Sequence, residues 1–165
     1  FNANLKRWVS ESALRRCVEA LIHLNREAAE IMKKYEIHAV TDVTGFGLGG
    51  HALEMAKGSG VRLRIKMDEL PLFDEALAMY EKGMSTGVNR HNEKLIGAYL
   101  EYENEFTASQ KEMILDPQTS GGLLAALPAE QAAELVSELQ QVPTPAAAII
   151  GEVLSGDDKP GLIIA

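Results

Sequence analysis

The stretch that decides the fold is Ala39-Val40-Thr41-Asp42-Val43-Thr44-Gly45-Phe46-Gly47-Leu48-Gly49-Gly50-His51. It opens with a short apolar run that ends in one carboxylate, Asp42, with a threonine on either side. Four glycines follow within six residues, and good helix formers continue from His51 to Lys57. This order predicts a strand that enters a tight backbone turn and opens a helix.

The glycine turn indicates a phosphate site, because such a junction aims backbone N–H groups and a helix N-terminus at one point. Asp42, Thr41 and Thr44 supply the hard oxygen atoms that Mg²⁺ prefers. We therefore expect a metal–phosphate site with Asp42 as the metal ligand, and with Thr41, Thr44, Gly45 and Gly47 close to the phosphates. The alternative role for Asp42 is an Asx hydrogen bond that caps the turn.

Size and composition fit one globular domain that spans residues 1–165. The hydrophobic content of 46% and the charged content of 24% are ordinary for a soluble protein. A net charge of −8 argues against nucleic acid as the partner, since phosphate backbones are bound by clustered Lys and Arg. No apolar run approaches the roughly 18 residues of a membrane span, so we expect no membrane partner.

The ends and the cysteine usage give two further expectations. The chain starts at Phe1 and not at Met, which indicates processing or a longer parent protein. No signal peptide is visible. The only cysteine, Cys17, excludes an intrachain disulfide and favours a reducing compartment, the cytoplasm.

Hydrophobic periodicity predicts the other elements. Strand 61–66 alternates apolar side chains with Arg62, Arg64 and Lys66, as a half-exposed strand does. Ser10 or Ser12 is the expected cap of the first helix, which buries Cys17 in its apolar stripe. This mixture of elements favours an α+β fold with a mixed sheet. The expected helices cover 11–35, 47–58, 71–82, 89–103 and 129–141, the strands 37–43, 61–66, 123–127, 146–154 and 161–165, and a turn 155–159.

Gly45, Gly47 and Gly50 also spell the G-x-G-x-x-G pattern of dinucleotide-binding folds. Asp68 lies 18 residues beyond Gly50, near the place where such folds keep an acidic residue for the ribose. Two features count against this alternative. Rossmann strands are buried on both faces, unlike strand 61–66, and the charge of Asp42 would oppose a pyrophosphate.

Two other features have open roles. The segment Thr119–Gly122 leads from a loop into a strand, so it is either a tight turn or a backbone nest for an anion. His51, at the start of a helix, is either part of a structural hydrogen-bond network or a general base, and the structural role is favoured. No Ser/His/Asp arrangement stands out, so we assign no catalytic residue.

Two long motifs carry a family resemblance. Thr41–His51, followed by Asp116-Pro-Gln-Thr-Ser-Gly-Gly-Leu-Leu124, resembles selenophosphate synthetase (selenide, water dikinase), of the aminoimidazole ribonucleotide synthetase superfamily. Leu24-Asn25 also fits. Ser85–Asn89 matches only loosely a Pro-Gly-Gly-Thr run that the family often has before an Asn. The resemblance covers nearly the whole chain, but only the carboxy-terminal half of the enzyme.

The resemblance implies an α+β fold, a mixed sheet covered by helices with a distant ferredoxin-like character. The family enzyme is a homodimer that converts ATP, selenide and water to selenophosphate, AMP and phosphate, with Mg²⁺ on the ATP phosphates. Its amino-terminal domain, the implied partner of this chain, carries the reactive cysteine or selenocysteine, a lysine and most metal-binding aspartates. The motif matched by Asp42 contributes one metal ligand. This half alone is therefore expected to be inactive; a role restricted to packing and dimerisation is the competing hypothesis.

Overall fold

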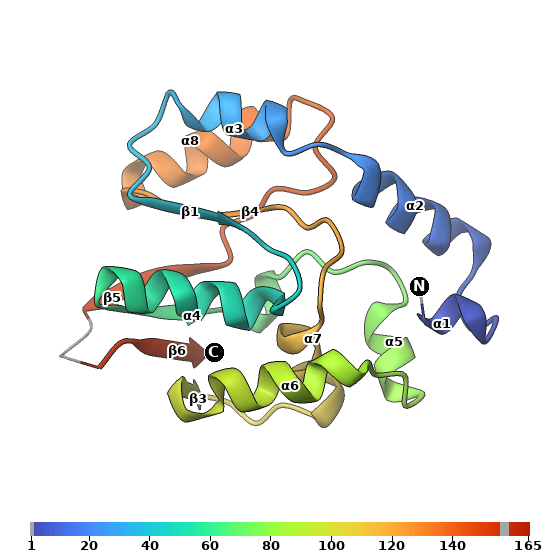
Figure 1. The fold of residues 1–165 in the computed structure, drawn as a ribbon. Coiled ribbons are helices and arrows are strands. Elements are labelled where there is room, and N and C mark those ends of the chain that lie inside the picture. The colour runs from blue at the N-terminus through green and yellow to red at the C-terminus, as the bar shows by residue number, and fades with distance from the viewer. Residues whose placement is uncertain (1, 156–158) are drawn as a thin grey trace.

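The computed structural model describes residues 2–155 and 159–165, which form two sheets and the helices around them (Figure 1). Most of the predicted turn 155–159 lies outside the described residues. The helices are α1 (Asn2–Leu5), α2 (Glu11–Ile22), α3 (Arg26–Met32), α4 (Gly47–Ser59), α5 (Ala76–Glu81), α6 (Gly87–Ile96), α7 (Ala108–Leu115) and α8 (Ala129–Leu139), with short 3₁₀ turns η1 (Met67–Glu69) and η2 (Gly97–Tyr99). The strands are β1 (Ala39–Asp42), β2 (Val61–Ile65), β3 (Leu100–Tyr102), β4 (Leu123–Ala126), β5 (Gly151–Ser155) and β6 (Gly161–Ile164).

Both sheets contain antiparallel pairs. Strands β1 and β4 form a two-stranded antiparallel sheet. The other sheet has the order β3-β6-β2-β5, in which β2 is parallel to β6 and antiparallel to β5, and β3 is parallel to β6. This confirms the predicted α+β class with a mixed sheet. It also removes the dinucleotide-binding alternative, because the strand before the glycine turn lies in an antiparallel pair and not in a parallel Rossmann sheet.

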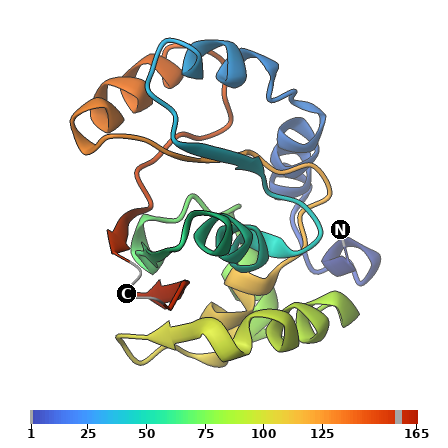
Figure 2. The same ribbon diagram turned by 60° about the vertical axis from the view of Figure 1, so that its left-hand side comes forward.

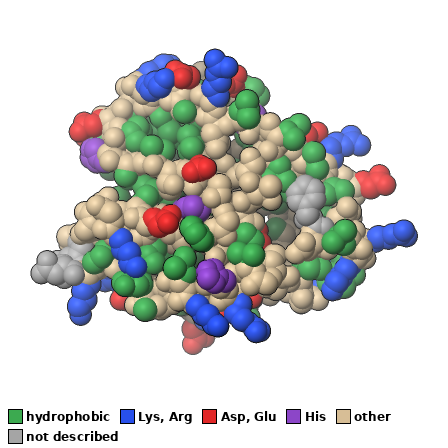
Figure 3. All heavy atoms as spheres, viewed as in Figure 1, with side chains coloured by type: hydrophobic (Ala, Val, Ile, Leu, Met, Phe, Trp, Pro, Cys, Tyr) green, Lys and Arg blue, Asp and Glu red, His purple; other side chains and the backbone are tan. Residues whose placement is uncertain are grey.

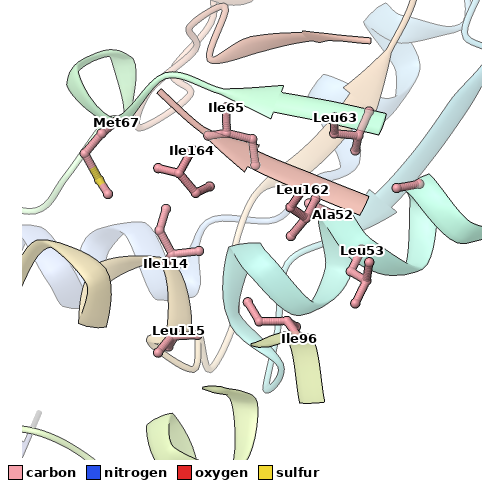
Figure 4. Packing of buried hydrophobic residues seen from close by; sticks show 11 residues of the cluster. Ala52, Leu53, Leu63, Ile65, Met67, Ile96, Ile114, Leu115, Leu162 and Ile164 are labelled. Carbon is pink, nitrogen blue, oxygen red and sulfur yellow. The ribbon is translucent and has the colours of Figure 1, made fainter. Parts of the chain in front are cut away.

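Helix α4 occupies the middle of the molecule, between the β1–β4 pair and the four-stranded sheet (Figure 1). It packs its Ala52, Leu53 and Ala56 against β2, β6, α6 and α7. Figure 4 shows the same cluster from close by, with Leu162 and Ile164 of β6 pointing toward the helices. The helix that opens from the glycine turn is thus fixed by the main core.

A second, smaller core lies on the other side of the β1–β4 pair. Helices α3 and α8 pack together there, as both views of the ribbon show (Figures 1 and 2). Its buried residues are Ile31, Met32, Leu135 and Leu139. The β1–β4 pair is therefore covered by helices on both faces, which fixes the strand end that carries Asp42.

The predicted long helix 11–35 is wrong in its middle. The chain breaks at residues 23–25 into α2 and α3, and Asn25 donates from Nδ2 to the Gly121 carbonyl at 2.9 Å. Ser10 caps α2 as predicted, since its side chain accepts from the Ala13 N–H. However, Ile22 is 72% exposed and Cys17 is only half-buried, so α2 does not bury the whole expected stripe. Figure 3 shows hydrophobic side chains at the surface of this end of the molecule.

The middle of the chain departs from prediction where tertiary contacts override helix propensity. The helix expected over 71–82 begins only at Ala76, because Glu75 has a left-handed backbone with φ of 64° and its carboxylate accepts from Ser10. The helix expected over 89–103 starts earlier and ends at Ile96, and β3 follows it to pair with β6. Helix α7 was not predicted. It begins with a capping box between Thr107 and Gln110.

The remaining predicted elements overlap the observed ones, although some are shorter. Strand β2 is half-exposed, with Arg62 and Arg64 paired to glutamates of β3, β5 and the residue after β3. The strand expected over 146–154 is shorter at its start and runs over Gly151–Ser155. None of the helices among the described residues combines the length and the apolarity that a membrane crossing needs.

Candidate functional site

The two glycine-rich motifs lie against each other. Strands β1 and β4 pair in a register that sets Asp42 opposite Leu123. Beyond the ladder, the Val43 N–H donates to the Gly122 carbonyl at 3.0 Å. The Gln118 N–H donates to the Thr44 carbonyl, also at 3.0 Å. Segments that are far apart in sequence therefore form one unit around the end of β1.

Two glycines make this close approach possible. Gly47 has φ of +68°, and a Cβ there would lie 2.9 Å from the Asp116 carbonyl oxygen and from the Leu115 carbonyl carbon. A Cβ on Gly121 would lie 2.1 Å from the Val43 carbonyl oxygen. Backbone packing between the motifs thus explains both glycines independently of any ligand.

Helix α6 adds a third element to this unit through Asn92. The side chain is fully buried, and its Nδ2 donates to the Gly45 carbonyl at 3.0 Å and to the Leu115 carbonyl at 2.9 Å. One amide group therefore ties the glycine turn to the end of α7. Sequence reasoning missed Asn92, although its spacing from Asn89 and Ile96 on α6 marks a polar residue on a buried helix face.

A polar network holds Asp116 on the inner side of the second motif. The Tyr80 hydroxyl donates to Asp116 Oδ1, and Gln118 Nε2 donates to Oδ2 at 2.8 Å. Asn89, in the loosely matched segment, donates from Nδ2 to the Tyr80 hydroxyl at 3.1 Å. Burial raises the pKa of Asp116, against the two hydrogen bonds that lower it. With both oxygens engaged, Asp116 holds the loop and is not an open ligand.

Asp42 stands at the exposed rim of this unit. Thr41 Oγ1 donates to the Asp42 carbonyl at 3.1 Å, so the neighbouring hydroxyl stabilises the backbone of the strand end. Among the described residues we find no hydrogen bond to the Asp42 carboxylate, and hence no Asx cap. The carboxylate is free to bind a group from solvent.

The other predicted site residues divide into inward and outward groups. The Gly47 N–H donates to the Thr44 carbonyl at 3.0 Å, so it is occupied within the turn. Gly45 is exposed, while its carbonyl oxygen accepts from Asn92. The Thr44 hydroxyl lies 3.1 Å from His51 Nε2. Of the five, Asp42 and Gly45 are the two residues that face solvent openly, and Thr41 and Thr44 are half-buried.

The donor set fits a magnesium ion only in part. Asp42 offers one carboxylate, and the described residues contain no group of three His, Cys, Asp or Glu side chains that could hold a metal. Mg²⁺ is commonly bound by one or two carboxylates together with water and substrate phosphates. The residues present therefore fit the role of contributing one ligand to a site that other groups complete.

Asp42 does not line either of two surface hollows found on the described residues. One, of about 550 Å³, is lined by Lys34, Tyr35, Glu36, Gln131, Glu134 and Glu138. The other, of about 480 Å³, is lined by Ser85, Thr86, Gly87, Arg90, Glu93 and Glu112. Both are rich in carboxylates, which disfavours an anionic ligand in them. The open rim at Asp42 remains the candidate site, on its geometry and chemistry.

Comparisons with known proteins find relatives that match most of the chain. Residues 9–162 match the family model of the AIR synthase related protein, C-terminal domain. The chain is 38% identical over 156 residues to selenide, water dikinase 2 of Peptoclostridium acidaminophilum, covering 94% of this chain and 45% of that protein. It is 41% identical over 150 residues to selenide, water dikinase of Treponema denticola, covering 88% and 42%. The chain thus spans less than half the length of these relatives.

A solved structure shows the same fold at lower sequence identity. Thiamine monophosphate kinase from Aquifex aeolicus superposes with a TM-score of 0.59 and 20% identity, over 98% of this chain and 43% of that protein. The family match covers both glycine motifs and the α6 segment that joins them. On this evidence, the chain belongs to the family of AIR synthase related C-terminal domains.

Proposed function

We propose that this chain is the carboxy-terminal domain of an ATP-dependent selenophosphate synthetase. In the complete protein, ATP, selenide and water would be converted to selenophosphate, AMP and phosphate. The similarity to two selenide, water dikinases at 38% and 41% identity supports this substrate class. The observation that carries the proposal is the packing of the two glycine motifs around the end of β1, with the Asp42 carboxylate exposed at their rim.

Asp42 would supply one ligand to Mg²⁺, which would neutralise the charge of the ATP phosphates. The turn at Gly45 and Gly47, with Thr41 and Thr44, would lie close to those phosphates. The net charge of −8 supports the need for a metal, since this domain itself offers little positive charge to a nucleotide. The domain's own contribution is to fix one oxygen ligand on a rigid strand end.

The other ligands, the nucleophile and a lysine would come from the amino-terminal domain of the same protein, as partner of this one. The relatives are more than twice as long as the matched segment, which leaves room for such a domain. A homodimer would form the complete enzyme, and the lone Cys17 favours the reducing cytoplasm as its location.

Replacement of Asp42 by alanine in the complete protein tests the proposal. Loss of a metal ligand costs several kcal/mol of charge stabilisation, so we expect selenide-dependent AMP formation to fall by about 100-fold. Because Asp42 is exposed and unpaired among the described residues, the free energy of unfolding should change by less than about 0.5 kcal/mol.

Asp68→Ala is the matched control, since Asp68 is another exposed aspartate just after a strand, β2. Its activity should equal that of the wild type. Full activity of Asp42→Ala would reject the metal role and favour a domain that serves only in packing and dimerisation.

A further inference from the structure

Large hydrophobic side chains lie exposed at the end of the molecule formed by α1, α2 and the loop before α5 (Figures 1 and 3). Ile22 and Leu24 are each 72% exposed. The Arg16 guanidinium pairs with Asp74, which brings the loop before α5 beside α2. We call this surface the α2 patch, and its members are Leu5, Val18, Ile22, Leu24, Leu72 and Phe73.

The apolar stripe of α2 lies outside both hydrophobic cores. Its members follow one another at helical spacing and are Leu14, Cys17, Val18, Leu21 and Ile22. Among the described residues, neither core cluster contains a residue of α2, and only Ala13 of this helix is buried. A helix of 12 residues is marginal in water by itself, because most helix stability in proteins comes from packing of the apolar face. The described residues therefore leave the stripe without the cover that it needs.

Polar contacts hold α2 at both ends. Before its first turn, the Ser10 N–H donates to Glu75 Oε2 at 3.0 Å, and the Ser10 hydroxyl donates to Glu75 Oε1 at 2.5 Å. Beyond its last turn, Asn25 Nδ2 donates to the Gly121 carbonyl at 2.9 Å. The α2 patch is therefore a fixed surface, and its apolar side chains are already in place for a partner.

The patch ends beside the glycine motifs. Leu24 directly precedes Asn25, which bonds Gly121 of the second motif. Gly121 in turn packs against the carbonyl of Val43, the residue after Asp42. A surface seated on the α2 patch therefore adjoins the unit that carries Asp42, where the proposed metal site needs ligands from another domain.

Basic side chains surround the patch, in contrast to the rest of the chain. Residues 1–26 contain five Lys and Arg against two Glu, whereas the whole chain has a net charge of −8. Lys6, Arg7 and Arg15 are exposed in this segment. Opposite charges at the rim of an interface favour the correct pairing. A covering surface that is apolar at its centre and carries carboxylates at its rim fits this pattern.

The length of the relatives indicates what covers the patch. The match spans 45% and 42% of the two selenide, water dikinases, and the family model describes a C-terminal domain. Under the function proposed above, an amino-terminal domain is therefore joined to this chain through α1, which contains Leu5 of the patch. A tethered domain binds at a high effective concentration and loses less translational and rotational freedom than a separate molecule.

We propose that the α2 patch is the docking surface for the amino-terminal domain of the same polypeptide, whose contacting face is apolar with carboxylates at its rim. Docking covers Val18 and Ile22, completes the packing of α2 and places that domain beside the rim of Asp42. This inference rests on the proposed function, which supplies the second domain, and it names the face of this chain that receives it.

Site-specific photo-crosslinking of the complete protein tests the proposal. The photoreactive amino acid p-benzoylphenylalanine replaces Ile22 in one preparation and Val153 in another. Val153 is the matched control, because it is 50% exposed on β5, outside the patch. We expect position 22 to cross-link to peptides of the amino-terminal domain, identified by mass spectrometry, at the mass of one chain on a denaturing gel. Position 153 should give no cross-link to that domain.

A charge placed in the patch gives a second, independent readout. Hydrogen exchange of the complete protein, followed by mass spectrometry of its peptides, reports the local opening of α2. In Ile22→Glu the α2 amides should exchange at least about 10-fold faster than in the wild type, because a docked Ile22 would be replaced by a buried, unpaired charge. Exchange of α8 should not change, and Val153→Glu should leave α2 as in the wild type.

Three kinds of result would overturn the proposal. No cross-link from position 22, or equal yields from positions 22 and 153, means that the domain does not dock on the patch. A cross-linked band at the mass of two chains assigns the patch to a second copy. Unchanged exchange of α2 in Ile22→Glu means that Ile22 stays exposed. These measurements use no ATP, Mg²⁺ or selenide, so the docking and the chemistry tested by Asp42→Ala can each fail while the other stands.

Discussion

Gly47 and Asn92 are the residues that bring the two motifs together. Gly47 lets the start of α4 touch the backbone at the end of α7, and Asn92 bonds the carbonyls of Gly45 and Leu115 with one buried amide. Neither residue presents a group to solvent, since both are buried. Their contribution is to the geometry of the rim, on which the exposed Asp42 depends.

Gly47→Ala should destabilise the chain. The left-handed backbone costs a side chain about 1–2 kcal/mol, and the new Cβ meets backbone atoms at 2.9 Å, so we expect a loss of at least about 2 kcal/mol in the free energy of unfolding. Urea denaturation followed by circular dichroism measures it. Gly58→Ala, in the same helix with open space around it, should raise stability by about 0.5–1 kcal/mol. Equal effects of the two changes would contradict this account.

Asn92→Leu keeps the branched shape and the number of side-chain heavy atoms but removes the donor. The carbonyls of Gly45 and Leu115 both lose their side-chain donor. We expect this loss to lower the free energy of unfolding by about 2–4 kcal/mol. The same urea measurement applies. Asn104→Leu, at an exposed position, should change stability by less than about 0.5 kcal/mol. A neutral result for Asn92→Leu would show that the amide does not hold the turn.

At the scale of elements, α8 is tied to the end of α3 by charged and polar contacts above the β1–β4 pair. Lys34 pairs with Glu138, and the Tyr35 hydroxyl donates to Glu138 Oε2 at 3.0 Å. The hydrogen bond from Lys34, followed by that from Tyr35, lowers the pKa of Glu138. The glutamate therefore links the second core to the chain segment that leads into β1.

Glu138→Gln should reduce the acid sensitivity of the chain. Because the folded pKa of Glu138 lies below its ordinary value, its contribution to stability is present above that ordinary value. The contribution is lost as the pH falls through the folded pKa. The variant should be less stable at neutral pH, and its urea midpoint should fall less than that of the wild type down to about pH 3. Glu134→Gln on the same helix serves as the control; parallel pH profiles for wild type and Glu138→Gln would reject the linkage.

At the scale of the whole molecule, the site is a rim and not an enclosed pocket. The main core fixes α4, the second core covers the other face of the β1–β4 pair, and the end of β1 projects between them. The described residues contain no group of three His, Cys, Asp or Glu side chains that could hold a metal, and Asp42 is exposed. The fold thus holds the Asp42 carboxylate in an open position on a fixed strand end.

Residues 1–165 alone should show no selenide-dependent formation of AMP from ATP. A single carboxylate would hold Mg²⁺ only weakly, so most of the negative charge of the ATP phosphates would stay uncompensated. A phosphate-release and AMP assay of the 165-residue chain, beside the complete protein, measures this. Turnover by the 165-residue chain would show that the chemistry needs no further domain.

Local sequence patterns predicted the elements that depend on hydrophobic periodicity, turn residues and helix caps. The glycine turn between β1 and α4, the half-exposed β2 and the Ser10 cap follow from short-range preferences, and the structure confirms them. The predicted helix over 11–35 failed because Asn25 has a partner far along the chain, the Gly121 carbonyl. Strand β3 escaped prediction since its pairing with β6 is a non-local contact.

The sequence by itself determined the chemistry available at the end of β1: one carboxylate, two hydroxyl groups and glycines that permit a tight turn. It also determined the α+β class, because segments with the hydrophobic periodicity of helices and of strands are mixed along the chain. Only the tertiary structure decided that the second motif lies against the first, that Asp116 is engaged while Asp42 is open, and that Asn92 and His51 hold the turn. The physical reason is that the contacts between the motifs and with Asn92 join residues distant in sequence, and burial and hydrogen-bond partners exist only once the chain has folded.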